Sequence, residues 1–173
     1  RTLDYSEGIY MGYKWYETAA TIDGYFNETA PKDAELPYGI TDVMPDGVTD
    51  TYYNRYNGVL YPFGYGLSYT SFEWEVGEPS VTKLAADTEV SISVKVRNTG
   101  SVAGKDVVQL YFDPPYTAGG IEKAATNLVN FAKTDTLEPG EEQTLTLTFN
   151  ARELASFDWN DANENDFSGY ELE

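Results

Sequence analysis

The sequence predicts a mostly β fold whose main part is an antiparallel β-sandwich. Three observations predict it: apolar and polar residues alternate in short runs, turn residues separate these runs, and this pattern begins only near residue 71. A chain of 173 residues suffices for one solid core, or for one domain plus a fragment of another. We therefore expect two parts, residues 1–70 and residues 71–173.

The clearest predicted strand spans residues 89–97. Its apolar side chains face one way and its polar side chains face the other, which is typical of a strand with one buried face. The apolar set is Val90, Ile92, Val94 and Val96. Residues 98–100 (Asn-Thr-Gly) end this strand. Residues 107–112 are apolar on both faces, which indicates a strand in the centre of its sheet, and the two prolines at 114–115 end it.

Turn signals continue in the rest of this part. Residues 138–141 (Glu-Pro-Gly-Glu) predict a type II turn, because proline sets φ and glycine accepts a positive φ. Residues 144–149 alternate again and predict a strand, and residues 152–157 predict one helical turn at the sandwich edge. Such strands indicate an immunoglobulin-like sandwich. Since the Cys–Trp–Cys pattern of antibody domains is absent, we predict a fibronectin type III-like antiparallel β-sandwich over residues 71–173.

The first part, residues 1–70, has a different pattern of apolar and polar residues. Residues 8–17 are apolar or aromatic at nearly every position, which indicates burial on both sides, yet a part with so little periodicity cannot enclose them. Residues 20–58 predict a long polar loop, and such loops are rare in a compact domain unless they are functional or packed on another body. We infer that residues 1–70 are the tail of a larger domain.

Charge and missing residue types exclude several functions. The net charge of −18 repels phosphate backbones and anionic lipid headgroups, so we expect neither a nucleic-acid partner nor a membrane partner. A neutral sugar or a metal cation stays compatible with this charge. Without cysteine or histidine, the chain cannot form a disulfide, a thiolate metal site or a serine–histidine triad. The composition leaves the cellular location open.

Several motifs follow one another along the chain. They are residues 5–16 (YSEGIYMGYKWY), 61–72 (YPFGYGLSYTSF), 96–100 (VRNTG), 103–111 (AGKDVVQLY), 137–141 (LEPGE) and 152–158 (RELASFD). Together they resemble glycoside hydrolase family 3, the β-glucosidase and β-xylosidase family. One departure is Tyr65, where many members have histidine. The resemblance implies that residues 1–70 are the C-terminal tail of an α/β-sandwich domain and that residues 71–173 are the family's fibronectin type III-like domain.

The resemblance also implies that this chain holds no catalytic residue and no cofactor. Family members are retaining enzymes that use two carboxyl groups, one as nucleophile and one as acid/base. The family's nucleophile is an aspartate of a barrel domain, and its acid/base glutamate lies in the α/β domain upstream of residue 5. Asp158-Trp159 lies in the sandwich half and does not match the nucleophile motif.

Several residues of the first part, residues 1–70, are candidates for a functional role. Asp4 and Glu7 are either a carboxylate pair near a sugar or partners within a turn, and we favour the turn. An aromatic cluster either stacks on sugar rings or belongs to an interdomain core, which we favour; it comprises Tyr10, Tyr13, Trp15 and Tyr16. A second cluster lies in the predicted loop and supplies our substrate-binding candidates, Tyr52, Tyr53 and Tyr56.

Two further sequence patterns resemble a calcium-binding loop and a glycosylation site. Residues 161–166 imitate the start of a calcium loop, but the glycine and the glutamate that such a loop needs are replaced by Asp166 and Leu172. We therefore expect an acidic hairpin tip and no metal site. Residues 27–29 (Asn-Glu-Thr) form a glycosylation sequon, which matters only in a secreted eukaryotic protein.

These observations favour one function and leave two alternatives. The chain is expected to be a non-catalytic portion of a retaining β-glycosidase that hydrolyses terminal β-glycosidic bonds, with the fibronectin-like domain as a structural buttress. Its partners are then the remaining catalytic domains of the parent enzyme and, for the intact enzyme, a β-linked oligosaccharide or glycoside. The alternatives are a stand-alone module that binds carbohydrate or a cell surface, and a structural spacer.

Overall fold

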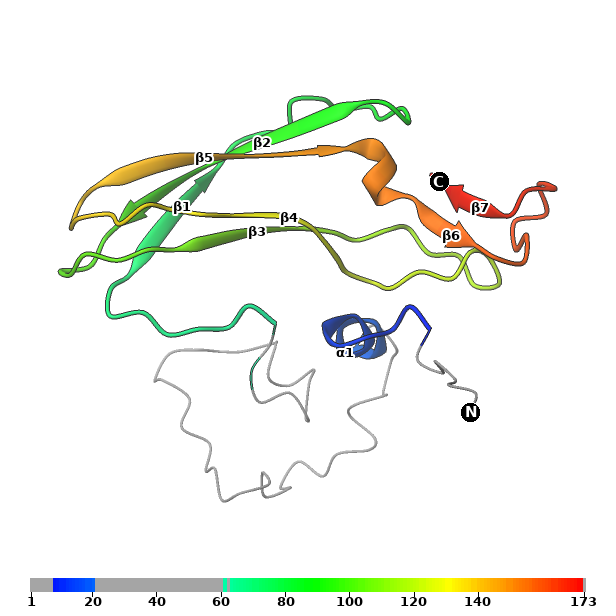
Figure 1. Ribbon diagram of the computed structural model, residues 1–173, viewed down its shortest axis with the longest axis horizontal. Coiled ribbons are helices and arrows are strands. Elements are labelled where there is room, and N and C mark those ends of the chain that lie inside the picture. Colours follow the sequence, from blue (N-terminus) through cyan, green and yellow to red (C-terminus); the bar gives the residue numbers. More distant parts are fainter. Residues whose placement is uncertain (1–7, 21–60, 62, 173) are drawn as a thin grey trace, which may run out of the picture. The chain divides into compact units, whose positions relative to one another are not determined.

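Antiparallel β-strands make up most of the regular secondary structure in the part of the chain that the structure describes (Figure 1). The computed structural model describes residues 8–20, 61 and 63–172. The chain divides into two units, Arg1–Tyr65 and Gly66–Glu173, and each is described here by itself. The strands all lie in the second unit, so the prediction of a mostly β fold is confirmed.

One sheet of the second unit contains three strands. They are β1 (Phe72–Val76), β2 (Glu89–Asn98) and β5 (Glu142–Asn150), arranged antiparallel in the order β1-β2-β5. The alternation predicted for β2 is confirmed, because Val90, Val94 and Val96 are buried while Ser93 and Arg97 are exposed. The predicted strand 144–149 is also present, and it is longer than the sequence indicated.

The second sheet contains β3 (Val107–Phe112) and β4 (Asn127–Lys133), which pair antiparallel with a register shift after Leu110. Buried side chains from both sheets form one core, which is the arrangement of a β-sandwich; its buried members are Val94, Val96, Val108, Leu137, Leu145 and Leu147.

The prediction that β3 is a central strand is wrong for the described residues. Within them, β3 pairs with β4 along one edge and no strand lies along its other edge. Apolar residues on both faces of a strand report how its side chains are covered, and they do not fix how many neighbours its backbone has.

Two local predictions can be compared directly with the structure. The turn at 138–141 is confirmed, since Gly140 has φ 84° and Glu141 N donates to Glu138 O at 2.9 Å. The helical turn is shorter than predicted: a 3-10 helix, η1, spans Ala151–Leu154. It ends early because the chain becomes extended at Ala155 and then forms β6 (Ser156–Asp158), which pairs with β7 (Gly169–Glu171).

In the first unit the structure describes one helix, α1 (Tyr13–Ala20). Gly12 precedes it with φ 59°, a conformation that glycine adopts without a steric penalty. The predicted loop at 20–58 lies outside the described residues, apart from residue 20 at the end of α1. The assignment of residues 1–70 to an α/β domain and of residues 71–173 to a separate domain stays a prediction. No helix in the described part is both long enough and apolar enough to cross a membrane.

Candidate functional site

The predicted substrate-binding residues Tyr52, Tyr53 and Tyr56 lie outside the described residues, as do Asp4, Glu7 and the sequon at 27–29. Their roles stay predictions. The described residues contain three other features with functional meaning: an aromatic cluster in the first unit, a buried amide at the start of the sandwich, and an open cavity between the two sheets.

The aromatic cluster of the first unit brings two motifs together. Tyr13 of α1 stacks on Phe63, with ring centroids 4.7 Å apart, so the motif at 5–16 contacts the motif at 61–72. Trp15 packs edge-on against Tyr16, and Phe63 keeps about half of its surface exposed. Amphipathic rings that remain exposed suit either a protein partner or a sugar face, so both interpretations remain open for this cluster.

A single buried amide, Asn98 at the end of β2, ties the entering chain to the sandwich. Asn98 is fully buried. Its Oδ1 accepts hydrogen bonds from Thr70 Oγ1 at 2.7 Å and from Gly100 N at 3.0 Å. Its Nδ2 donates to Val102 O and to Leu137 O, both at 2.8 Å. All four bonding positions of this amide are therefore used. We call Asn98 and Thr70 the linker latch.

Close backbone approach supports the linker latch. A Cβ atom on Gly100 would lie 2.1 Å from Thr70 Oγ1 and 2.8 Å from Ser71 N, which leaves no room for any side chain. The backbone of Ser71 also accepts hydrogen bonds from Thr99 N at 2.8 Å and from Gly100 N at 3.3 Å. Residues 70–71 are thus bound to the turn after β2 by side-chain and backbone bonds together.

The acidic hairpin at 161–166 is held by its own hydrogen bonds. The Asp161 carboxylate accepts from Asn165 N at 2.8 Å and from Asp166 N at 3.1 Å. Nearby, Asp158 is buried and accepts from Asn160 N at 3.1 Å and from Ala162 N at 2.7 Å. In the described part of the chain, no group of three or more acidic side chains is arranged to hold a metal ion. These carboxylates shape the turn.

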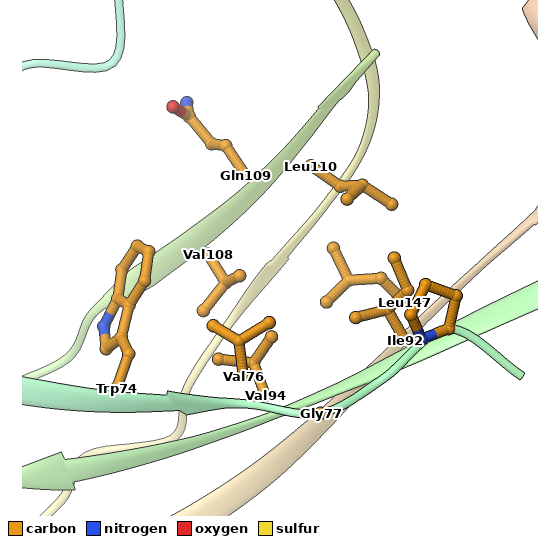
Figure 2. Close-up of a pocket in the computed structure, with 10 residues that line it drawn as sticks. Trp74, Val76, Gly77, Ile92, Val94, Val108, Gln109, Leu110 and Leu147 are labelled. Carbon is orange, nitrogen blue, oxygen red and sulfur yellow. The ribbon is translucent and has the colours of Figure 1, made fainter.

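An apolar cavity of about 220 Å³ opens between the two sheets (Figure 2). Trp74 and Val76 of β1 face Val108 and Leu110 of β3 across it. The rest of the lining comes from β2, β5, Gly77, Pro79 and Gln109. Val76 keeps 65% of its surface exposed, although it points toward the core side of the sandwich. Large exposed apolar patches mark contact sites for a protein or a membrane, or grooves that bind a ligand.

Sequence reasoning missed both the linker latch and the cavity. The residue types behind the latch were visible, because Asn98 ends an apolar strand and Gly100 follows two residues later. The sequence indicates a strand end here and one of the motifs that resemble glycoside hydrolase family 3, and neither indicates a hydrogen-bonded attachment. Nothing in the sequence showed that Thr70, 28 residues upstream, is the partner of Asn98.

Comparisons with known proteins agree with the fold. The model of the fibronectin type III-like domain family matches residues 106–164. The β-glucosidase of Ruminococcus albus is 38% identical over 89% of this chain, and β-glucosidase A of Butyrivibrio fibrisolvens is 35% identical over 90%. The chain spans 12% and 16% of the length of these two relatives.

Solved structures give the same result. The β-glucosidase from Paenibacillus barengoltzii superposes with a TM-score of 0.66 and 35% identity, covering 92% of this chain and 13% of that one. β-Glucosidase 3B from Thermotoga neapolitana, solved with glucose, gives a TM-score of 0.57 and 31% identity over 88% of this chain and 16% of that one. The chain is thus a relative of the β-glucosidases of glycoside hydrolase family 3, and it carries a fibronectin type III-like domain.

Proposed function

We propose that this chain is a non-catalytic portion of a retaining β-glycosidase and that its sandwich acts as a structural buttress for the catalytic domains. The linker latch is the observation that carries the proposal. A buttress must transmit its rigidity to the chain that enters it, and here a fully satisfied, buried amide holds that chain at Thr70. A spacer needs no such attachment, because a flexible connection keeps two bodies apart equally well.

The described residues also support the non-catalytic part of the proposal. A retaining glycosidase needs two carboxyl groups about 5–5.5 Å apart beside the scissile bond. The buried carboxylate Asp158 is engaged by two backbone N–H groups of its own turn, and the apolar cavity between the sheets has no acidic residue in its lining. The glycosidic bond is therefore cleaved by domains of the parent enzyme that lie outside this chain.

A thermal inactivation experiment on the parent enzyme tests the buttress. In the enzyme that contains this chain, Asn98→Ala should shorten the half-life of aryl β-glucoside hydrolysis at elevated temperature while leaving kcat at 25 °C unchanged. The matched control is Asn130→Ala, because this amide bonds Thr148 O at the surface. If both variants inactivate at the wild-type rate, the sandwich is a spacer. Turnover of an aryl β-glucoside by the isolated 173 residues would contradict the non-catalytic assignment.

A second candidate function is a carbohydrate-binding module. Phe157 of β6 and Tyr170 of β7 are opposite one another in the register and pack edge to face, with centroids 5.0 Å apart, and both remain largely exposed. Exposed aromatic rings on a chain of charge −18 suit a neutral, hydroxyl-rich ligand. Calorimetry with cello-oligosaccharides decides this point: no heat at millimolar sugar removes the candidate, and heat that Tyr170→Ala abolishes supports it.

A further inference from the structure

The hairpin of β6 and β7 contains two buried oxygen atoms that lack a hydrogen-bond donor (Figure 1). In the part of the chain that the structure describes, two buried side-chain polar atoms have no hydrogen-bond partner, and they are Asn163 Oδ1 and Glu171 Oε1. An amide oxygen and an ionised carboxylate oxygen only accept hydrogen bonds. Since native proteins leave few buried polar groups unpaired, we expect each of these oxygens to contact a donor or a cation.

The two oxygens belong to head groups that are in direct contact. Asn163 Nδ2 donates to Glu171 Oε2 at 3.0 Å, and Asn165 Nδ2 donates to the same carboxylate oxygen at 2.6 Å. Oδ1 of Asn163 and Oε1 of Glu171 are the other atoms of the two head groups that this first bond joins. Ca²⁺ binds oxygen at about 2.3–2.6 Å, so one ion can bridge two oxygens that are up to about 5 Å apart.

The structure removes both objections that the sequence raised against a calcium loop. Asp166 replaces the glycine of such a loop, yet it adopts φ 63°, the positive φ that the glycine would supply. Leu172 replaces the final glutamate, but the carboxylate of Glu171, one residue earlier, reaches the loop amides of Asn163 and Asn165. The residue types of a calcium loop therefore meet here in a different spacing.

Local charge favours a cation over a water molecule as the partner of these oxygens. The segment 161–171 contains four acidic residues, and the sequence from 153 to 173 contains no lysine or arginine. A water molecule donates hydrogen bonds but leaves the repulsion between the carboxylates in place, whereas a cation cancels it. Carboxylate and amide oxygens select hard cations. Ca²⁺ accepts an irregular set of such ligands, while Mg²⁺ needs nearly ideal octahedral geometry.

We propose that Asn163 Oδ1 and the Glu171 carboxylate bind one Ca²⁺ ion, with Asp161 as a further ligand. Each Asp161 oxygen accepts one backbone hydrogen bond and keeps a lone pair for the ion. The ion fastens the loop at 159–168 to β7. Two of these three ligands are acidic, so the site differs from a group of three acidic side chains. With so few charged ligands, we expect a Kd of about 10⁻⁴–10⁻³ M. The proposal does not depend on the buttress function.

Calorimetry with CaCl2 on the EDTA-treated 173-residue chain tests the site. Glu171→Gln should weaken binding about 10-fold or more, because it removes a charged ligand. The matched control is Glu164→Gln, which removes the same charge from an exposed position of the same loop and should change the Kd by less than about 2-fold. Absence of heat at about 10 mM Ca²⁺ overturns the proposal. Equal weakening in both variants also overturns it, since binding then reports only the total charge. Equal affinity for Mg²⁺ overturns the choice of calcium.

A gain of affinity separates a ligand role from a folding defect. Asn163→Asp adds a charge to the ligand set and should tighten Ca²⁺ binding about 5- to 10-fold, a result that an unfolded hairpin does not give. Unchanged or weaker binding overturns the proposal. NMR locates the ion: amide resonances of residues 161–171 should shift on titration, while those of the exposed acidic turn at 138–142 should not. Equal shifts in both segments overturn the proposal, because the ion is then spread over the acidic surface.

Discussion

Replacing Asn98 with alanine should destabilise the sandwich unit by about 2–4 kcal/mol. The side chain is fully buried and makes four hydrogen bonds. Alanine removes the side-chain partner of each bond. Gly100 N still donates to Ser71 O at 3.3 Å, and Leu137 O still accepts from Gly104 N at 3.1 Å. The affected groups are Thr70 Oγ1, Gly100 N, Val102 O and Leu137 O.

The magnitude follows from how deeply each group lies. The bond to Leu137 O is buried, but this carbonyl also accepts from Gly104 N at 3.1 Å, so the loss of one of its two bonds costs about 0.5–1.5 kcal/mol. The other three bonds are partly buried, so water replaces the lost partner in part, and each loss costs about 0.5–1 kcal/mol. A domain stability of about 5–15 kcal/mol exceeds this loss, so the variant stays folded at 25 °C with a smaller free energy of unfolding.

Urea denaturation measures the effect. With an m value of about 2 kcal/mol per molar urea, the midpoint should fall by about 1–2 M for Asn98→Ala. The control Asn130→Ala loses two exposed hydrogen bonds, to Thr148 O and from Phe131 N, and its midpoint should fall by less than about 0.5 M. Equal midpoint shifts in the two variants would refute the reasoning, because burial would then not decide the cost.

Other substitutions test separate parts of the sandwich. Gly100→Ala should destabilise the sandwich by about 1–3 kcal/mol, because the new methyl group overlaps Thr70 Oγ1, and its melting temperature should fall. An unchanged melting temperature would show that the linker latch can move. The Glu75 carboxylate raises the pKa of Lys95 through its hydrogen bond and its charge, so this stabilisation is present below pH 10.5 and is lost as the pH rises further. Glu75→Gln should lower that pKa in an NMR titration. Asp158→Asn should cost about 1.5–3 kcal/mol in urea, since one backbone N–H loses a charged acceptor.

Local signals explain which elements the sequence predicted correctly. The strand at 89–97 was identifiable because its valines must face one side of the sheet, and they do. The turn at 138–141 was identifiable because Pro139 fixes φ at the second turn position and Gly140 accepts the positive φ that a type II turn needs at the third. Both signals are complete within a few residues and need no knowledge of the rest of the fold.

Long-range partners explain what the sequence did not reveal. The strand β4 has half-buried residues on both faces without a clear alternation, so its period gives no strand signal. The side chain of Asn98 bonds to Thr70 and to Leu137, which are 28 and 39 residues away. Local patterns carry no information about such partners, and for this reason the most important polar group of the sandwich was not predicted.

The strand β3 shows how a wrong prediction can still carry physical information. Its apolar faces indicated a central strand, whereas the described part of the chain gives it one neighbour. Selection for apolar residues on both faces is expected only where both faces and the adjacent cavity are covered in the working molecule. Because Val76 and Trp74 are half exposed beside this strand, the difference between pattern and structure is located at one edge.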